Sequence, residues 1–211
     1  YGVLLKNLGK FQEAEALYRK AIEIKPNDPT AYSNLGSLFI DLCKLEDAEL
    51  FTRKAIELNP CCANSHVNLG MVLNDLGKYK EAFFYILKAI KFSPNNNQNY
   101  NQMTSLLRNC QASILNKNEL TDILKILLER DDVPHKDLFK VFNSLYEKEI
   151  INYLKKVSSE NSKEEDLFQN LITDELLINA IKKIIFKDII WEKLLTKVRR
   201  NICNRIAKNI E

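Results

Sequence analysis

The residues best suited to chemistry are scarce in this chain, and the densest group of them lies at residues 61–66. His66 follows Cys61 and Cys62 closely, which brings together a thiol and an imidazole, the pair that a nucleophile and its base would need. A nucleophilic site also requires a third group that orients the imidazole, and none is apparent in the sequence. We therefore favour a structural role, with the cysteines in a loop and His66 in place of a core aromatic residue.

The sequence also gives no evidence for a metal site or a cofactor site. Zinc needs four ligands, and the spacing of these residues and of the second histidine, His135, matches no familiar zinc pattern. Phosphate and dinucleotide sites need glycines where the backbone approaches the ligand, and all five glycines lie at or before Gly77. The adjacent carboxylates Glu164 and Glu165 stand where they would cap a helix. The sequence predicts no catalytic residue, no metal site and no cofactor.

Positive charge gathers on one side of a helix expected near residues 188–209. One stripe of this helix carries four basic residues, Lys193, Lys197, Arg200 and Lys208. Such a stripe can meet an acidic partner or a phosphate backbone, but no aromatic residues interleave with it, as single-stranded nucleic acid would favour. We interpret the stripe as the solvated side of an amphipathic helix with Trp191 on its apolar side, and we expect no nucleic-acid partner.

Composition favours helices throughout the chain. The 211 residues include only five glycines and five prolines, while 45% are hydrophobic, enough to bury a core. The net charge of +3 is too small to identify a partner. Five cysteines without C-x-x-C spacing are typical of reduced thiols in a cytosolic protein. Because no apolar run reaches the ~18 residues that a membrane span needs, we expect a cytoplasmic protein that does not span a membrane.

An internal repeat reveals the elements that would position any site. The heptapeptide KAIEIKP at residues 20–26 returns as KAIELNP at 54–60 and as KAIKFSP at 88–94, each time 34 residues later. Columns of small residues and prolines repeat with it: Gly2, Gly36 and Gly70; Ala14, Ala48 and Ala82; Ala21, Ala55 and Ala89; Pro26, Pro60 and Pro94. Small residues let two helices approach closely, and proline ends the second of them.

Each 34-residue unit is therefore expected to be a helix–turn–helix, with helix pairs at 30–42/46–58 and 64–76/80–92. The turn inside each unit falls on a column that holds Gly9, Cys43 and Gly77, where a glycine would end the first helix. Such a unit cannot bury its apolar face alone, so successive units must stack.

In these columns the sequence resembles the tetratricopeptide repeat (TPR) family. Residues 29–62 and 63–96 are complete units, residues 1–28 are a partial unit, and residues 97–110 are expected to form a capping helix. The resemblance implies an all-α solenoid of about three repeats whose first helices line a concave side. Because the chain begins inside a repeat, we expect it to be part of a longer protein.

Residues 111–211 are expected to form a separate helical domain. Four or five helices fit, one of them starting at a capping box of Ser162 and Glu165. The stretch IIWEKLLTKVRR is similar to a segment that follows repeat arrays in some bacterial proteins that continue into a transferase domain. Apolar residues recur at helical spacing: Leu120, Ile123, Leu127; Leu138, Val141, Phe142, Leu145; Leu171, Leu176, Ile181 and Ile184.

The polar side of the first helices, which would line the groove of the solenoid, is the best place for a function. Its candidate peptide-binding residues are mostly short or amide-bearing: Ser33, Asn34, Ser37, Asp41, Asn64, Asn68, Met71, Asp75 and Gln102. Short side chains of this kind leave room for an extended peptide and offer hydrogen bonds to its backbone.

Two subtypes of the family can be compared at these columns. Asn34 and Asn68, continued by Gln102, resemble the asparagine ladder of repeat arrays that feed glycosyltransferases. The columns of Ser33 and Ser37 lack the lysine and asparagine with which other members clamp a C-terminal carboxylate. A carboxylate clamp is therefore not expected here.

Two functions remain open from the sequence. We favour a non-enzymatic module that binds an extended peptide or protein segment in the groove. The alternative is the substrate-recruiting and linker region of a larger bacterial transferase, for methyl or glycosyl groups, whose catalytic domain lies outside these residues. The sequence identifies neither the ligand nor the oligomeric state.

Overall fold

The computed structural model describes residues 1–157, 173–184 and 191–196, with the backbone alone for 153–157. The chain divides into two compact units, Tyr1–Leu106 and Leu107–Glu211. Every regular element within the described residues is a helix, which confirms the predicted all-α class. The division falls inside the helix expected to cap the repeats, four residues before the expected boundary at residue 110.

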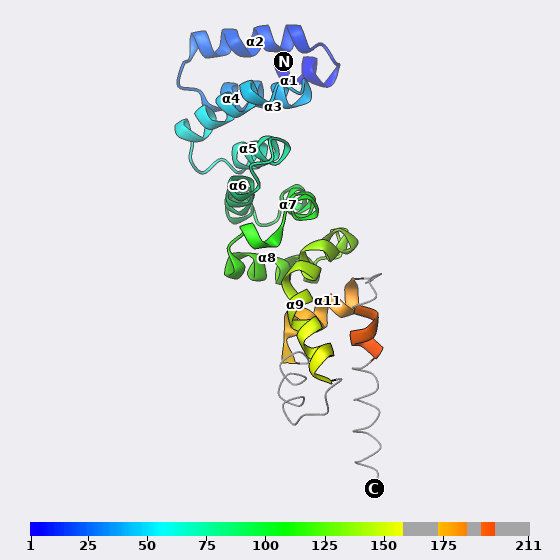
Figure 1. The fold of residues 1–211 in the computed structure, drawn as a ribbon. Helices are drawn as coiled ribbons and strands as arrows, with labels where there is room; N and C mark the ends of the chain where they lie inside the picture. Colours follow the sequence, from blue (N-terminus) through cyan, green and yellow to red (C-terminus); the bar gives the residue numbers. More distant parts are fainter. Residues whose placement is uncertain (158–172, 185–190, 197–211) are drawn as a thin grey trace. The chain divides into compact units, whose positions relative to one another are not determined.

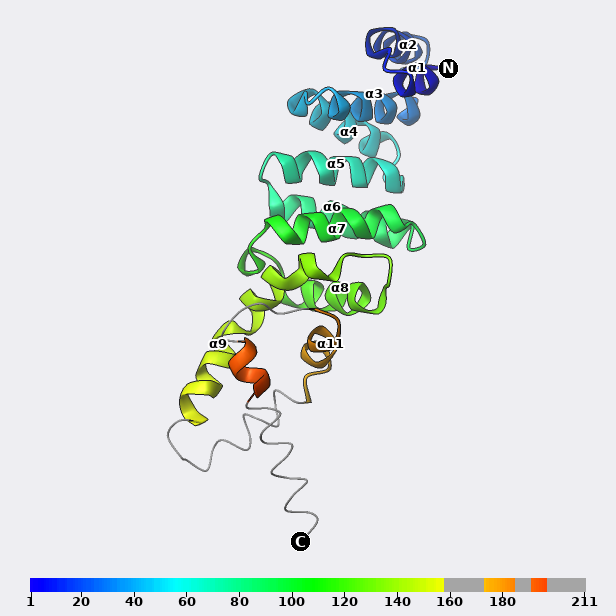
Figure 2. The same cartoon turned by 90° about the vertical axis from the view of Figure 1, so that its right-hand side faces the viewer.

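Helices follow one another in pairs along the first unit (Figure 1). The pairs are α1 (Gly2–Asn7) with α2 (Phe11–Ile24), α3 (Pro29–Asp41) with α4 (Leu45–Leu58), and α5 (Ala63–Asp75) with α6 (Tyr79–Phe92), followed by α7 (Asn97–Asn109). Each of α3 to α6 lies within one residue of its expected range. The two helices of each pair are in contact, and α2 contacts α3 as α4 contacts α5, so the units stack. Figure 2 shows α3, α5 and α7 lying one beside the next.

The turn between the two helices of a unit is closed by the same backbone hydrogen bonds each time. After α5, Gly77 N donates to Asn74 O at 3.0 Å and Lys78 N donates to Leu73 O at 2.8 Å. This pattern places the turn residue in the left-handed region, where φ is +73° for Gly77. Cys43 adopts the same conformation, with φ of +55°, although it carries a side chain.

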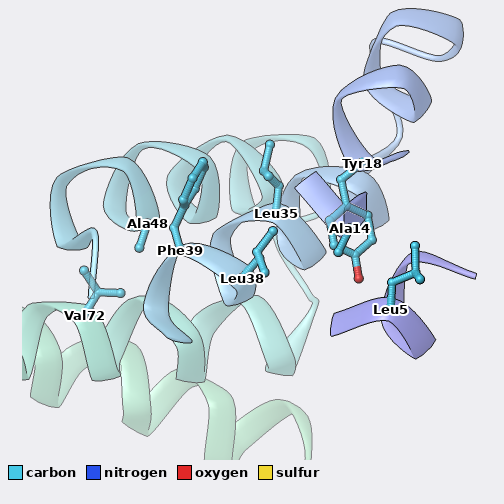
Figure 3. Packing of buried hydrophobic residues seen from close by; sticks show 8 residues of the cluster. All are labelled: Leu5, Ala14, Tyr18, Leu35, Leu38, Phe39, Ala48 and Val72. Atoms are coloured by element: carbon cyan, nitrogen blue, oxygen red, sulfur yellow. The ribbon is translucent and has the colours of Figure 1, made fainter. Parts of the chain in front are cut away.

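The small residues of the repeat lie where helices cross, as predicted. Ala48 is fully buried, and so is its equivalent Ala82. A Cβ atom added to Gly36 would lie 2.6 Å from Thr52 Cγ2, so only glycine fits between α3 and α4. Figure 3 shows how the core continues from unit to unit: Leu5, Ala14 and Tyr18 come from the first pair, Leu35, Leu38, Phe39 and Ala48 from the second, and Val72 from α5.

Where the structure describes it, the second unit is helical. Its described elements are η1 (Ala112–Ile114), α8 (Lys117–Glu129), η2 (His135–Leu138), α9 (Phe139–Val157), α11 (Glu175–Lys183) and the helical residues 191–196. Trp191 is fully buried, and its Nε1 donates to Asn143 Oδ1 at 2.6 Å. Tyr146 donates its hydroxyl hydrogen to Asp174 Oδ2 at 3.0 Å, while Asp174 also caps α11 by accepting from Leu177 N.

Most of the apolar residues that recur at helical spacing in this unit are buried. The buried members are Leu120, Ile123, Leu127, Leu138, Val141, Phe142, Leu176 and Ile184. Leu145 and Ile181 are half-buried. Other residues named from the sequence lie outside the described residues: Ser162, Glu164, Glu165, Leu171, Lys197, Arg200 and Lys208.

Across the described parts of the chain, no helix is both long enough and apolar enough to cross a membrane.

Candidate functional site

Three amide side chains occupy equivalent places on successive first helices. Asn34 on α3, Asn68 on α5 and Gln102 on α7 are 34 residues apart, and all three are half-buried. Gly36 faces the second helix of its unit, and a residue two positions earlier is turned by about 200° from it, onto the opposite side. We call the surface that these amides share with their neighbours on α3, α5 and the part of α7 up to residue 106 the first-helix face.

The three amides have no hydrogen-bond partner within the described chain. Asn34 and Asn68 each offer one acceptor oxygen and two donor hydrogens to a molecule on the first-helix face. Gln102 offers the same groups on a longer side chain. Amides in this state can form hydrogen bonds with a group that offers both a carbonyl and an N–H.

Two of the predicted binding residues on α3 are already engaged with α1. Lys6 Nζ donates to Ser37 Oγ at 2.6 Å and lies 3.0 Å from Asp41 Oδ2. The sequence prediction missed Lys6, because its column continues as Ile40, Asn74 and Arg108 and so shows no repeated type. The repeat length gave the one available clue. Lys6 and Ser37 are 31 residues apart, so Lys6 lies three residues, or about one helical turn, after the position on α1 that is equivalent to Ser37 on α3.

The remaining predicted residues differ in how much they offer a ligand. Ser33 accepts a hydrogen bond from the buried Ser65 at 3.2 Å, so its hydroxyl is partly engaged. Met71 is half-buried, and Asn64 is exposed near the start of α5. Asp75, the last residue of α5, is exposed and makes no ion pair with any described residue. Val67, which stands 34 residues after Ser33 on α5, is buried, at 3% exposure.

Family models match most of the first unit. A model described as TPR repeat matches residues 2–42, and one described as tetratricopeptide repeat matches residues 29–60 and 63–96. Residues 2–60 and 63–96 are tetratricopeptide repeats. No curated protein sequence matches the chain.

Several solved structures share the fold at low identity. The structure titled YrrB, a TPR protein with an unusual peptide-binding site, is 20% identical, covers 86% of this chain and 88% of its own, and has a TM-score of 0.56. MamA is 14% identical, covers 87% and 94%, and has a TM-score of 0.57. An O-GlcNAc transferase of Thermobaculum terrenum is 19% identical over 62% of this chain and 25% of its own, with a TM-score of 0.54.

In this TPR protein His66 is a core residue, as the sequence analysis favoured. It is 1% exposed and its ring lies 5.8 Å from that of Tyr85 and 5.3 Å from that of Phe92. Its Nε2 lies 2.7 Å from Pro60 O, and because a carbonyl only accepts, Nε2 carries the hydrogen. Burial lowers the pKa of His66, so the ring is neutral and its Nδ1 is buried without a partner among the described residues.

The cysteines next to His66 do not complete a site. Cys61 is exposed, and Cys62 stands at the N-cap of α5, where its side chain makes no capping hydrogen bond. In the described stretches of the TPR protein, no three His, Cys, Asp or Glu residues gather as a metal ion would require.

An open depression of about 520 Å³ lies at the turns of the first two TPR units, away from the predicted residues. It is lined by Gly9, Lys10, Phe11, Gln12, Glu13, Glu15, Leu42 and Lys44. Lys10 already pairs with Glu13 at 3.2 Å, so the rim charges partly neutralise each other.

Proposed function

We propose that this TPR protein binds an extended segment of a protein partner on its first-helix face, and that it acts by binding rather than by catalysis. The observation that carries the proposal is the row of three equivalent, half-buried amides, Asn34, Asn68 and Gln102, that bond to nothing else in the described chain. Amides that are bonded only to water can exchange those bonds for bonds to a ligand, with a net gain of ~0.5–1.5 kcal/mol for each bond.

The spacing of the amides suits a peptide backbone. The α3 and α5 helices are in contact, and the axes of packed helices lie about 8–10 Å apart. An extended chain advances about 3.3 Å per residue, so neighbouring amides would meet backbone groups about three residues apart. Each amide can donate to a peptide carbonyl and accept from a peptide N–H, which makes recognition independent of the ligand's side chains.

A clamp for a terminal carboxylate is not favoured at this face. Such a clamp needs a free cation, and Lys6, the described lysine beside the α3 part of the face, is paired with Asp41 and Ser37. The exposed Asp75 at the end of α5 adds a negative charge. The ligand that fits is an internal, extended segment rather than a chain end.

The similarity to YrrB is compatible with this proposal, because that structure is titled as having a peptide-binding site. At 20% identity the similarity shows the shared fold, and the proposal rests on the amides. The alternative, a recruiting and linker region of a transferase, stays a hypothesis, since the similarity to the O-GlcNAc transferase is likewise one of fold. A cytoplasmic location stays a prediction from composition.

A binding experiment with the full chain tests the proposal. A displayed library of random 12-residue peptides is selected on the protein, and the enriched peptides are synthesised with a fluorescent label for anisotropy titration. Each lost side-chain hydrogen bond should cost ~0.5–1.5 kcal/mol, so Asn34→Ala with Asn68→Ala should weaken binding about tenfold.

A matched pair of asparagines provides the control. Asn27→Ala with Asn95→Ala removes two exposed amides from equivalent turns between units and should leave the affinity unchanged within twofold. If the Asn34/Asn68 variant keeps full affinity for every enriched peptide while its circular dichroism is unchanged, the peptide does not bind this face.

A further inference from the structure

The outer face of α6 differs from the same face of the other second helices. At about 100° per residue, five of its residues fall within about 100° of one another and point away from the buried side: Lys80, Phe84, Leu87, Lys88 and Lys91. The buried side of the helix carries Ala82, Phe83, Ile86, Ala89 and Ile90. We call the five outward residues the α6 patch.

The repeat supplies a comparison for each residue of the α6 patch. The equivalent residues are Gln12, Ala16, Arg19, Lys20 and Glu23 on α2, and Glu46, Leu50, Arg53, Lys54 and Glu57 on α4. Counting Lys and Arg as +1 and Glu as −1, the five positions sum to +1 on α2, to 0 on α4 and to +3 on α6. Two acidic residues of α4, Glu46 and Glu57, are thus replaced by lysines on α6.

The charges of α4 are neutralised locally, whereas those of the α6 patch are not. Arg53 lies 2.7 Å from Glu49, and Lys54 lies 3.0 Å from Glu57. Within the described residues no carboxylate lies at ion-pair distance from Lys80, Lys88 or Lys91. The nearest acid along α6, Glu81, is held by Arg53 at 2.9 Å.

The α6 patch is also apolar at its centre. Phe84 is 49% exposed, and Lys88 Nζ lies 4.5 Å from the centre of its ring. Phe92 borders the patch and is 39% exposed. A cation held over an exposed aromatic ring, between two further lysines, is a surface that gains both from losing contact with water and from meeting negative charge.

We propose that the α6 patch docks an acidic amphipathic helix of a partner protein. Residues 80, 84, 87 and 91 follow one stripe over three turns, about 16 Å at 1.5 Å per residue. A helix laid along this stripe would place apolar side chains on Phe84 and Leu87 and carboxylates on the flanking lysines. The site is separate from the first-helix face, so it does not depend on the function proposed above.

A lipid surface fits the α6 patch less well. Helices that lie in a membrane interface insert a broad apolar face, and the broad apolar face of α6 is buried in the repeat stack. Only Phe84 and Leu87 remain for contact with lipid, which favours a protein helix whose own apolar residues complete the interface.

The test uses the full chain and a displayed library of random 16-residue peptides. Peptides enriched on the parent protein are depleted on the variant Lys80→Glu/Lys88→Glu/Lys91→Glu. The control, Lys20→Glu/Lys25→Glu/Lys125→Glu, makes the same change in net charge at three exposed lysines outside the patch. We expect the surviving peptides to carry Asp or Glu beside apolar residues at i, i+4 and i+7 and to become helical on binding.

Labelled copies of these peptides should bind the patch variant at least tenfold more weakly, and should bind the control like the parent. Salt should weaken the binding, because exposed charges are screened. Phe84→Ser should weaken it as well, while Leu50→Ser at the equivalent position of α4 should not. The Asn34→Ala/Asn68→Ala variant should bind these peptides normally, which separates this site from the first-helix face.

Three results would overturn the proposal. In the first, the selected peptides are neutral or basic. In the second, no peptide binds the parent protein more tightly than the patch variant. In the third, the protein would sediment with phosphatidylserine-containing vesicles through the same lysines and bind no acidic peptide, which would assign the patch to a membrane surface.

Discussion

Gly36 of α3 packs so closely against Thr52 of α4 that a Cβ atom on the glycine would lie 2.6 Å from Thr52 Cγ2. Carbon atoms that are not bonded do not approach so closely, so the absence of a side chain decides how near the two helices lie. The equivalent Gly70 meets Ile86 in the same way. The depth of each helix crossing therefore depends on one glycine and on the residue that faces it.

Gly36→Ala should lower the free energy of unfolding by about 1–3 kcal/mol, because the added methyl group overpacks the crossing. The higher helix propensity of alanine offsets ~0.5–1 kcal/mol of this loss. Thr52→Ser removes Cγ2 but keeps the hydroxyl that donates to Ala48 O at 2.6 Å, so the double variant should recover most of the stability. Urea unfolding of the parent, both single variants and the double variant gives a double-mutant cycle. If the changes in unfolding free energy of the two single variants simply add in the double variant, the two residues do not interact as described.

Cys43→Gly should stabilise the protein by about 1 kcal/mol. Cys43 holds a φ of +55° in a turn whose equivalents are glycines, and a side chain in this region costs ~1–2 kcal/mol. The greater freedom of glycine in the unfolded chain cancels part of the gain. Chemical denaturation measures the change, with Cys61→Gly, an exposed cysteine without a positive φ, as the control. Equal effects of the two substitutions would show that the turn carries no strain.

Stability should fall in mild acid because of His66. Burial lowers the pKa of His66 in the folded state below the unfolded value of about 6.5. The neutral ring therefore contributes stability that is fully present above about pH 6.5 and is lost as the pH falls from there towards the folded pKa. His66→Phe keeps a ring between Tyr85 and Phe92 but does not titrate.

Urea unfolding of the parent and of His66→Phe at intervals from pH 8 to pH 5 tests this. The difference in unfolding free energy between the two proteins should be constant above about pH 7 and should move in favour of the variant below about pH 6. Other titrating groups cancel in this difference. A difference that does not change with pH would mean that His66 has the same pKa in the folded and the unfolded protein, as an accessible ring would.

Glu49 should contribute stability that is lost at a lower pH than the contribution of His66. Partial burial would raise the pKa of Glu49, but hydrogen bonds and charge from Lys78 at 2.9 Å and Arg53 at 2.7 Å hold it below its usual range. A depressed folded pKa means that the contribution is present above the unfolded pKa of about 4.3 and disappears as the pH falls through the folded value.

Glu49→Gln should cost up to about 1 kcal/mol at pH 7, the upper end for surface ion pairs, and less at pH 3. Glu57→Gln is the matched control, because Glu57 is 68% exposed and has a single partner, Lys54. Thermal melts at both pH values measure the loss of stability. A larger loss for Glu57→Gln than for Glu49→Gln would contradict a stabilising role for the ion pairs of Glu49 with Lys78 and Arg53.

The sequence by itself determined the boundaries of α3 to α6 to within one residue, and the places where the helices of the first unit cross. Equivalent residues in a repeat meet equivalent neighbours, so Gly36 and Gly70, or Ala48 and Ala82, could be assigned to one role by their 34-residue spacing alone. The same spacing located Asn34, Asn68 and Gln102 on one face. In the second unit helical spacing was enough to find most of the core, but it missed Asp174, whose partner Tyr146 is 28 residues away.

Only the tertiary structure decided which polar residues of the face are free. Lys6 binds Ser37, 31 residues away, and also Asp41, while Arg53 binds Glu81, 28 residues away. The repeated columns of the sequence do not predict these contacts. Ser33 and Val67 share a column, yet one is half-buried and the other is 3% exposed. A column records the average surroundings of a position, whereas an ion pair or a hydrogen bond depends on the two side chains that meet there, and these differ from one unit to the next.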